Sequence, residues 1–549
     1  MANKISIAVV IQDAIDAAIR NAYPDELGGE NLGCILDIPK DPGFGDFSTN
    51  IALNLSRKLK QRPQEIAARV IPGINELLRR DDILKEIREI KVEGAGFINF
   101  YLREEYFYAQ LKNILAKGRD AFTADIGAGR RALIEFVSAN PTGPLSVAHA
   151  RQAAVGESLA GILAFLGYQV QREYYLNDEG NQINILGKSV EFRLKESQGQ
   201  AGEFPENYYQ GEYIYDIAKE AGAKNIKAEA LGDFAAEYIL EIIKKELADF
   251  KVSFDCWYSQ KELRKGGKIQ EALDFLRQKG DLYEQDGALW FKSTQFGDDK
   301  DRVVIKSDGS YTYLAPDIAY HKEKYLRGFQ WLINLWGPDH HGYISRLKAA
   351  VQAMGYPEDS LSIVIVQLAT ISRAGKSVEM STRRGQYITL REVLDEVGPD
   401  AARFFFLMRR TSAHLDFDLE VAKKQTNENP VYYVQYAHAR ICNILKSAAR
   451  QPGAENELSL LREKEEIALL KKLSQFNGVL IACLKTTDPY FLTVYLQELA
   501  ESFHKFYDLH RVLSDNDGLT RARLALIAAV RTVIAAGLEL LGISRPEKM

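Results

Sequence analysis

Cysteine is scarce in this chain of 549 residues, and the few cysteines lie far apart. They form no CxxC pair, which argues against a zinc site or a disulfide framework and favours a reducing, cytoplasmic location. The four are Cys34, Cys256, Cys442 and Cys483. The sequence also lacks an apolar run of the length that crosses a bilayer, and acidic residues interrupt the apolar stretch near its start. We therefore expect no membrane association.

An excess of positive charge is missing as well. The chain has 70 Lys and Arg against 75 Asp and Glu, a formal net charge of -5, which argues against a protein that coats nucleic acids non-specifically. A local basic surface is not excluded, because binding depends on where the cations lie. The Walker pattern GxxxxGK[ST] is absent too. Finally, 549 residues are too many for one hydrophobic core, which predicts several domains.

The hydrophobic pattern divides the chain into three expected domains, residues 1–117, 118–428 and 429–549. In the first, apolar residues at helical spacing over 5–22 predict an amphipathic helix. A second helix is expected to begin after a cap at Ser48 or Thr49. "IKVEGAGFINFYL" is rich in β-branched and aromatic residues and predicts a strand. Together these elements predict a small α+β domain.

The middle domain opens with a strand–helix–strand pattern. "RALIEFV" and "YQVQREYYL" read as strands, and they flank a long helix that Gly167 ends. Such a βαβ unit predicts a parallel sheet. "WLINLWG" and "SIVIVQL" have the continuous hydrophobicity of strands buried on both faces. A charged, helical segment at about 194–295 is expected to interrupt this sheet as an insertion.

Beyond residue 429 the strand patterns stop. Four long stretches repeat apolar residues every three or four positions, which predicts a helical bundle. The expected fold is thus a multidomain α/β protein. It has a Rossmann-like parallel-sheet domain with a helical insertion, a small N-terminal α+β domain and a C-terminal α-helical bundle.

The loop "NPTGPLSVAH" joins the first strand of the middle domain to its long helix. Ligands of open parallel sheets bind beyond the carboxyl ends of the strands, where helix N-termini favour anions. Pro141 and Pro144 restrict the loop, and Gly143 allows close approach by another group. His149 can donate a hydrogen bond to a phosphate, although local sequence favours an ordinary helix-start residue. The residues alone support a weak hypothesis of a nucleotide site.

A longer stretch around this loop carries a family resemblance. "EFVSANPTGPLSVAHARQAAVGESLAGILAFLGYQVQREYYLNDEGNQI" closely resembles the signature block of class I aminoacyl-tRNA synthetases, specifically the arginyl-tRNA synthetases. The likeness continues through "YTYLAPDIAYH", "LWGPDHHGYISRLKAA", "VEMSTRRG", "GPDAARFFFLMRR" and "NPVYYVQYAHAR" to the closing "PEKM". "DPGFGDFSTNIAL" is similar to the family's N-terminal domain.

The resemblance implies an activity. Arginine is activated with ATP to arginyl-adenylate and pyrophosphate, and is then transferred to the 3′-terminal adenosine of tRNA(Arg). ATP with Mg²⁺ is the implied substrate complex, with no structural metal, and a monomer is the family expectation. Catalysis of this kind needs no covalent nucleophile, because it rests on alignment of the reactants and on charge stabilisation.

The resemblance also implies roles for individual residues. Ser146 and His149 lie in the element usually written HIGH. The residues expected to bind arginine are Glu135, Ser138, Ala139, Asn140, His149, Tyr313 and Asp317. Those expected at ATP are Gly143, Pro144, His149, Gly337, Asp339, His340, Gln367, Met380 and Ser381. Those expected at tRNA are Tyr432, Tyr436 and Arg440, which share a helix stripe and can stack on unpaired bases, or else pack in the core.

Several of these residues have a second explanation. Asp317 either binds the guanidinium of arginine, as the family likeness favours, or caps a helix. Glu135 is either a second guanidinium carboxylate or a member of a local ion pair. His340 and His341 are adjacent, but no further metal ligand lies at suitable spacing, so proximity to the nucleotide is preferred.

Two motifs depart from the family pattern. The HIGH element reads "SVAH", and the element usually written KMSKS reads "EMSTR", without either lysine. We hypothesise that Lys376 and Arg383 supply the cationic charge that stabilises departing pyrophosphate; the alternative is a solvated basic loop. A nucleotidyltransferase with the same phosphate loop and a non-catalytic tRNA-binding paralogue are the competing functions.

Overall fold

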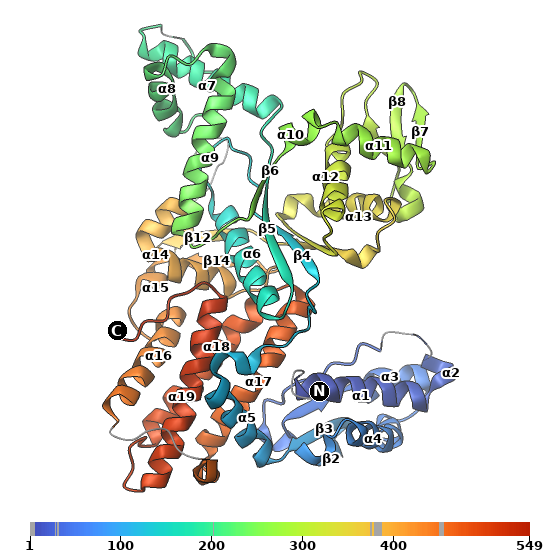
Figure 1. Ribbon diagram of the computed structural model, residues 1–549, viewed down its shortest axis with the longest axis vertical. Helices are drawn as coiled ribbons and strands as arrows, with labels where there is room; N and C mark the ends of the chain where they lie inside the picture. The colour runs from blue at the N-terminus through green and yellow to red at the C-terminus, as the bar shows by residue number, and fades with distance from the viewer. Residues whose placement is uncertain are drawn as a thin grey trace.

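The computed structural model describes residues 6–27, 29, 32–200, 202–373, 376–377, 387–448 and 455–549. Figure 1 shows three parts: a blue N-terminal domain at lower right, a central α/β region with two outgrowths at the top, and an orange-to-red helical bundle at lower left. The multidomain α/β fold expected from the sequence is confirmed.

The N-terminal domain holds a three-stranded antiparallel sheet of order β1-β3-β2, against which α4 packs. Its elements are α1 (Ile7–Ala22), α2 (Pro24–Leu27), β1 (Phe47–Thr49), α3 (Ile51–Leu59), α4 (Pro63–Arg80), β2 (Ile87–Glu93), β3 (Phe97–Leu102) and α5 (Glu104–Lys117). Two local predictions are wrong. The single expected strand is a hairpin, because Gly94 and Gly96 take positive φ and turn the chain. Ser48 and Thr49 belong to β1, and Asn50 is the N-cap residue of α3.

The central sheet has five parallel strands in the order β11-β10-β4-β5-β6. They are β4 (Arg131–Glu135), β5 (Gln169–Leu176), β6 (Cys256–Ser259), β10 (Trp331–Trp336) and β11 (Leu361–Ile365), and α6 (Val147–Phe165) joins β4 to β5. Leu133 and Leu332 enter the core on one face, and Ile134 and Ile333 enter the core on the other. Burial on both faces is therefore confirmed for β10, whereas β11 is an edge strand in which only Leu361 and Val364 are buried. The strand order reverses between β4 and β10, which creates a switch point there.

The segment at 194–295 is not a purely helical interruption. Its helices α7 (Asn181–Ser197), α8 (Tyr213–Ala223) and α9 (Leu231–Asp249) form the upper left outgrowth in Figure 1. The chain then returns to the sheet as β6, a short half-buried strand whose sequence, "CWYS", has no apolar periodicity that would reveal it. The upper right outgrowth contains α10 (Gln260–Lys265), α11 (Lys268–Gln278), β7 (Leu282–Gln285), β8 (Ala288–Phe291), β9 (Arg302–Ile305), α12 (Leu314–Leu326) and α13 (Ile344–Ala353).

The C-terminal part is helical over its described residues from 429 onward, as expected. It follows β12 (Ala369–Arg373), β13 (Lys376–Ser377), α14 (Leu390–Leu407), β14 (Leu415–Asp418) and α15 (Leu419–Lys423), and comprises α16 (Pro430–Ser447), α17 (Lys464–Thr486), α18 (Tyr490–Leu509) and α19 (Asp517–Leu540). Buried Arg403 on α14 donates to the carbonyls of Phe250 and Leu541, which joins the bundle to the end of α9. By length and composition alone α17 could span a membrane; it packs against α18, α5 and α19.

Candidate active site

The loops after β4 and β10 both start at the switch point, where open parallel sheets bind their ligands. After β4 the backbone turns through two non-glycine residues with left-handed conformations, Val137 at φ 66° and Ser138 at φ 40°. A β-branched residue in that region costs about 1–3 kcal/mol, so the surrounding structure must hold it. It does so through the Tyr175 backbone N–H, which donates to Ser138 Oγ at 3.1 Å, and through Tyr174 Oη, which donates to the Ala139 carbonyl at 2.9 Å.

A cavity of about 930 Å³ lies beside this loop. Residues 206–213 of the upper left outgrowth and residues just before and within α14 form its other walls. It brings together six residues expected from the sequence: Ala139, Asn140, Gly143, Pro144, Ser146 and His149. The predicted residues after β10, and Asp317, do not line it.

Ser146 and His149 form the N-terminal cap of α6. The Ser146 backbone N–H donates to His149 Nδ1 at 3.2 Å, so the neutral ring carries its proton on Nε2. Burial lowers the pKa of His149 to about 4, which keeps the ring neutral at physiological pH. His149 thus starts the helix and also lines the cavity with an N–H donor, so the two explanations offered for it are compatible.

Asp317 lies in the first turn of α12 but does not cap it. Its Oδ2 accepts a hydrogen bond from Tyr343 Oη at 2.6 Å, and within the described residues its Oδ1 has no hydrogen-bond partner. Burial raises the pKa of Asp317 to about 7, the hydrogen bond from Tyr343 opposes that shift, and nearby Glu135 adds to it. Among the described residues no cation forms an ion pair with this carboxyl, although the charge of nearby Lys324 lowers its pKa as a smaller contributor; a helix cap would instead be satisfied by backbone N–H groups.

Glu135 differs from Asp317, because it already has a cation. Lys324 Nζ lies 2.5 Å from Glu135 Oε2, and Ser138 Oγ donates to Oε1 at 3.2 Å. Lys324 is fully buried and also donates to Asn334. Of the two alternatives for Glu135, the structure therefore contains the local ion pair.

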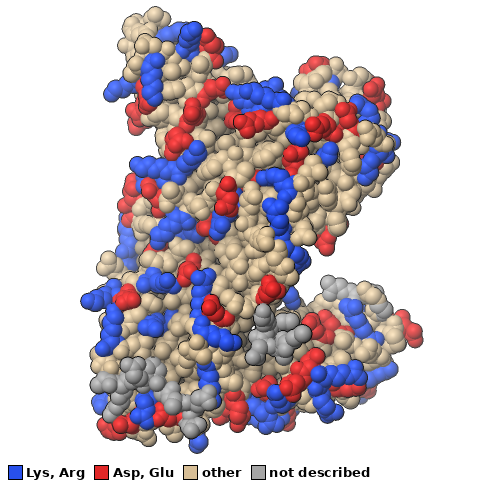
Figure 2. Space-filling model, viewed as in Figure 1, with Lys and Arg blue, Asp and Glu red and all other residues tan. Residues whose placement is uncertain are grey.

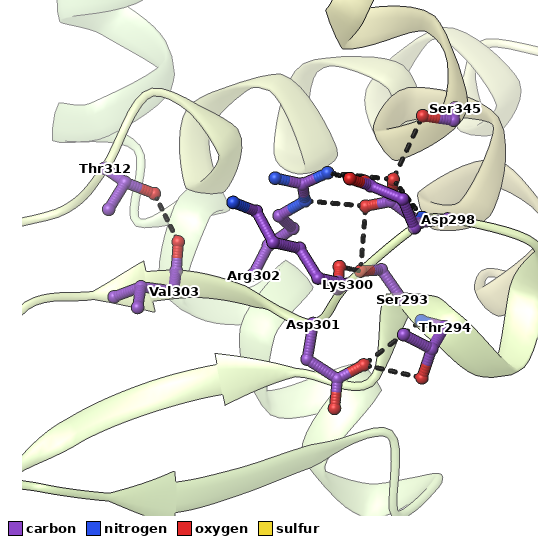
Figure 3. Close-up of polar contacts among 10 residues, drawn as sticks. Ser293, Thr294, Asp298, Lys300, Asp301, Arg302, Val303, Thr312 and Ser345 are labelled. Atoms are coloured by element: carbon purple, nitrogen blue, oxygen red, sulfur yellow. Dashed lines mark hydrogen bonds and ion pairs between the residues drawn. The ribbon is translucent and has the colours of Figure 1, made fainter.

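Tyr313, by contrast, is 80% exposed at the start of α12. The segment that carries it is fixed from β9, where Thr312 Oγ1 donates to the Val303 carbonyl at 2.8 Å. Figure 3 shows the adjoining network, in which buried Asp298 accepts hydrogen bonds from Arg302 and from Ser345 of α13. Burial opposes ionisation of Asp298, but these donors hold its pKa well below its usual range. The network ties β9 to α13.

The remaining residues expected at ATP follow β10 and β11. Asp339 and His340 are exposed on the 3₁₀ helix Pro338–Tyr343, which follows Gly337 directly. Gln367 lies after β11, and its carbonyl accepts a hydrogen bond from buried Arg151 of α6 at 2.8 Å. Within the described ranges, no three His, Cys, Asp or Glu residues are grouped so that they could hold a metal ion.

The residues hypothesised to supply cationic charge are only partly described. Lys376 is exposed on β13, and the nearby Arg373 already pairs with Glu396 at 2.5 Å. Arg383, Met380 and Ser381 lie outside the described residues.

A second cavity, of about 670 Å³, lies in the helical bundle. Tyr432, Tyr436 and Arg440 all line it, and the two tyrosine rings are parallel with centroids 6.0 Å apart. Arg440 lies 4.8 Å above the Tyr436 ring. His504 lines the same cavity and stacks on Tyr436, and sequence analysis missed it because it comes from a different helix, α18.

Sequence analysis also missed Lys324 and Tyr343. The spacing of Lys324, seven residues after Asp317 on one helix, was a usable signal. Tyr343 comes from another element, and only the fold brings its hydroxyl to Asp317.

Three family models match successive parts of the chain. The arginyl tRNA synthetase N terminal domain matches residues 9–102, the class I (R) tRNA synthetase catalytic domain matches 110–441, and the DALR anticodon binding domain matches 434–549. The chain belongs to the arginyl-tRNA synthetases. The arginine–tRNA ligase of Desulforamulus reducens is 44% identical over 100% of this chain and 99% of its own length, and that of Bacillus subtilis is 44% identical over 98% of each.

Solved structures agree on the fold. The Thermus thermophilus arginyl-tRNA synthetase aligns with a TM-score of 0.77 at 23% identity, over 98% of this chain and 100% of that one. The resemblance drawn from the motifs is thereby confirmed, and so is the enzyme class: this arginyl-tRNA synthetase is an ATP-dependent class I ligase. Because the matched models include the C-terminal third, they account for the helical bundle that a simple nucleotidyltransferase leaves unexplained.

Proposed function

We propose that this arginine–tRNA ligase carries out both steps of its reaction at the switch point between β4 and β10. Arginine is activated with ATP, pyrophosphate leaves, and the arginyl group passes to the 3′-terminal adenosine of tRNA(Arg). The observation that carries the proposal is Asp317, a half-buried carboxyl at this edge that has no ion-pair partner among the described residues. A planar guanidinium supplies that charge and paired N–H donors.

In this proposal the arginine side chain lies against Asp317, with Tyr313 closing over its exposed side. Its backbone end extends toward Ser138, Ala139 and Asn140. Glu135 contributes through the Lys324 pair, which fixes the floor of the pocket, and its direct contact with the guanidinium stays a prediction.

ATP, entering with Mg²⁺ as a substrate complex, occupies the cavity beside the loop after β4. Its phosphates face the N-terminus of α6, where the helix dipole and the His149 Nε2–H favour negative charge. Gly143 and Pro144 form the wall of this subsite. Gly337, Asp339, His340 and Gln367 lie at the neighbouring strand ends, outside the lining of this cavity, and their contact with the nucleotide stays a prediction.

Lys376 and Arg383 remain the proposed source of the charge that stabilises departing pyrophosphate. Alanine substitution at each, followed by pyrophosphate exchange with tRNA present, tests this. An unchanged rate in both variants would contradict it.

The bundle cavity with Tyr432, Tyr436 and Arg440 is proposed to stack an unpaired base of the tRNA. The face in Figure 2 shows Lys and Arg interspersed with Asp and Glu, so a basic tRNA-binding side stays a prediction. Arg440→Ala is expected to raise the KM for tRNA without changing the KM for arginine, and equal effects on both would contradict the assignment.

We further propose that the enzyme acts as a cytoplasmic monomer without membrane association. Its sedimentation mass, with and without tRNA, tests the monomer.

Purified enzyme, ATP, labelled arginine and tRNA together test the function itself. Charged tRNA(Arg) is the expected product, and tight tRNA binding without any charging would contradict the proposal.

A further inference from the structure

The loop after β4 is gripped by two tyrosine hydroxyls that come from opposite sides. Tyr213 Oη, at the start of α8, donates to the Thr142 carbonyl at 2.7 Å. Tyr387 Oη, just before α14, donates to the Pro144 carbonyl at 3.0 Å. Gly143 lies between these two carbonyls. We refer to Tyr213 and Tyr387 with these two hydrogen bonds as the tyrosine clamp.

Gly143 shows how close the clamp lies to the loop. A Cβ atom at this position would come within 3.0 Å of Tyr213 Oη and 3.3 Å of Tyr387 Oη. Only a glycine lets both hydroxyls reach the flanking carbonyls without displacement. This close approach gives Gly143 a structural role besides the ATP contact expected from the sequence.

Backbone pairing extends the grip toward His149. The Leu390 N–H donates to the Leu145 carbonyl at 2.8 Å, and the Val147 N–H donates to the Ile388 carbonyl at 3.3 Å. Thr389 forms an antiparallel bridge with Ser146. The residues just before α14 are thus joined to the loop that leads into α6 by an isolated antiparallel bridge and two backbone hydrogen bonds.

A third element, α9, also approaches this loop, through the buried side chain of Glu246. Glu246 lies near the Leu145 backbone, and burial raises the pKa of its carboxyl to about 7. Tyr387 lies near this carboxyl, and burial, with Glu246 a smaller contributor, raises the pKa of Tyr387 to about 12. The Tyr387 hydroxyl is therefore protonated at physiological pH and acts as a donor.

We propose that Tyr213 and Tyr387 are positioning residues for arginine activation. Their hydroxyls hold the loop that carries Ser146 and His149 in the shape that aligns ATP with the arginine carboxylate. Neither acts on the reacting atoms. The shape of the loop thereby depends on two other regions. Tyr213 belongs to the α7–α9 outgrowth, and Tyr387 directly follows "EMSTRRGQ" in the sequence.

The proposal rests on the proposed function of this loop in activation, and four single variants separate the two. Tyr213→Phe and Tyr387→Phe remove one clamp hydroxyl each. Tyr495→Phe is the matched control, because its buried hydroxyl also donates to a backbone carbonyl, that of Lys472 at 2.8 Å, in the bundle. His149→Ala tests the loop itself. The readouts are kcat and KM in pyrophosphate exchange with tRNA present, and the thermal unfolding midpoint.

Each clamp variant is expected to lower kcat about tenfold, with the KM for arginine within about twofold of wild type, because misplacement of reacting groups costs rate rather than affinity. The double variant is expected to lose less than the product of the single effects, since both hydroxyls hold one loop. Tyr495→Phe should keep wild-type kcat, with an unfolding midpoint similar to those of the clamp variants.

Wild-type kcat in both clamp variants, alongside an inactive His149→Ala, would overturn the clamp and leave the loop's role intact. Wild-type activity in His149→Ala would overturn the role of the loop. A loss of activity accompanied by an unfolding midpoint far below that of Tyr495→Phe would also overturn the clamp, because the loss would then report unfolding.

Discussion

The loop after β4, proposed to bind ATP, and the region around Asp317, proposed to bind arginine, differ in how fully their polar groups already have partners. On the nucleotide side, the loop between Thr142 and Val147 has its backbone groups taken up by neighbouring elements, and His149 is neutral. On the side proposed to bind arginine, Asp317 is half-buried without an ion-pair partner among the described residues, and Tyr313 is exposed. The first side is organised before any ligand arrives. In the proposed function the second is completed by a ligand that brings positive charge, so we expect selectivity for arginine to depend on the Asp317 side.

The largest effect is expected from removing the negative charge of Asp317. Asp317→Asn keeps the shape of the side chain and its acceptor for Tyr343, but the guanidinium then enters without a counter-charge. Loss of one partner of a buried charge pair costs about 4 kcal/mol, so kcat/KM for arginine should fall roughly 1000-fold. The KM for ATP should change little. A parallel rise in both KM values would break the division between the two sides.

Lys324→Met tests the pair beneath the pocket. It leaves Glu135 buried without its cation and should lower the free energy of unfolding by about 3 kcal/mol. Thermal denaturation measures this. The double variant Lys324→Met/Glu135→Gln removes both charges and should recover most of the lost stability. Equal destabilisation in the single and double variants would show that the pair does not behave as a unit.

Arginine binding should depend on pH through Asp317. Below a pH of about 7 the carboxyl is mostly protonated, so the affinity for arginine should fall about tenfold per pH unit and level off above pH 8. Tyr343→Phe removes a hydrogen bond that lowers this pKa, which should move the midpoint to higher pH. Calorimetric titration in buffers of different ionisation enthalpy should show proton release on binding near pH 6.5. A pH-independent affinity would contradict the assignment.

The smallest contribution to the pH dependence is expected from His149. Its pKa of about 4 lies below the ordinary value of 6.5 for histidine, so the folded protein resists protonation and this ring costs stability only as the pH falls from 6.5 toward 4. Between pH 5.5 and 8 the exchange rate of the wild type should show no titration from it. The exchange rate of His149→Asn should be lower than that of the wild type, but its pH profile should keep the midpoint near pH 7. In Asp317→Asn the pH profile should lose that midpoint.

The fold could be predicted from the sequence where the hydrophobic periodicity was clear or where Gly and Pro marked the ends of elements. Continuous apolar runs located β10 and β11, and the βαβ pattern located the loop after β4. β6 was not predicted, because its four half-buried residues show no alternation of apolar and polar side chains. The β2–β3 hairpin was predicted as one strand, because its turn is only three residues long. Site residues close together in the sequence, such as Ser146 and His149, could be grouped in advance. Tyr213, Tyr343 and Tyr387 could not, since only the fold brings their hydroxyls to the site.

Arg151, on the helix that follows the loop after β4, binds partners that lie far later in the chain and are therefore synthesised later. Its guanidinium binds the carbonyls of Gln367, Arg409, Arg410 and Ala413, the last of them 262 residues away in the chain. At about 5–20 residues per second, a ribosome takes roughly 13–50 s to cover that distance. Throughout that interval at least one of the four carbonyls that Arg151 binds has not yet been synthesised. The hydrogen bonds around Arg151 are therefore complete only after synthesis has passed residue 413, shortly before α16.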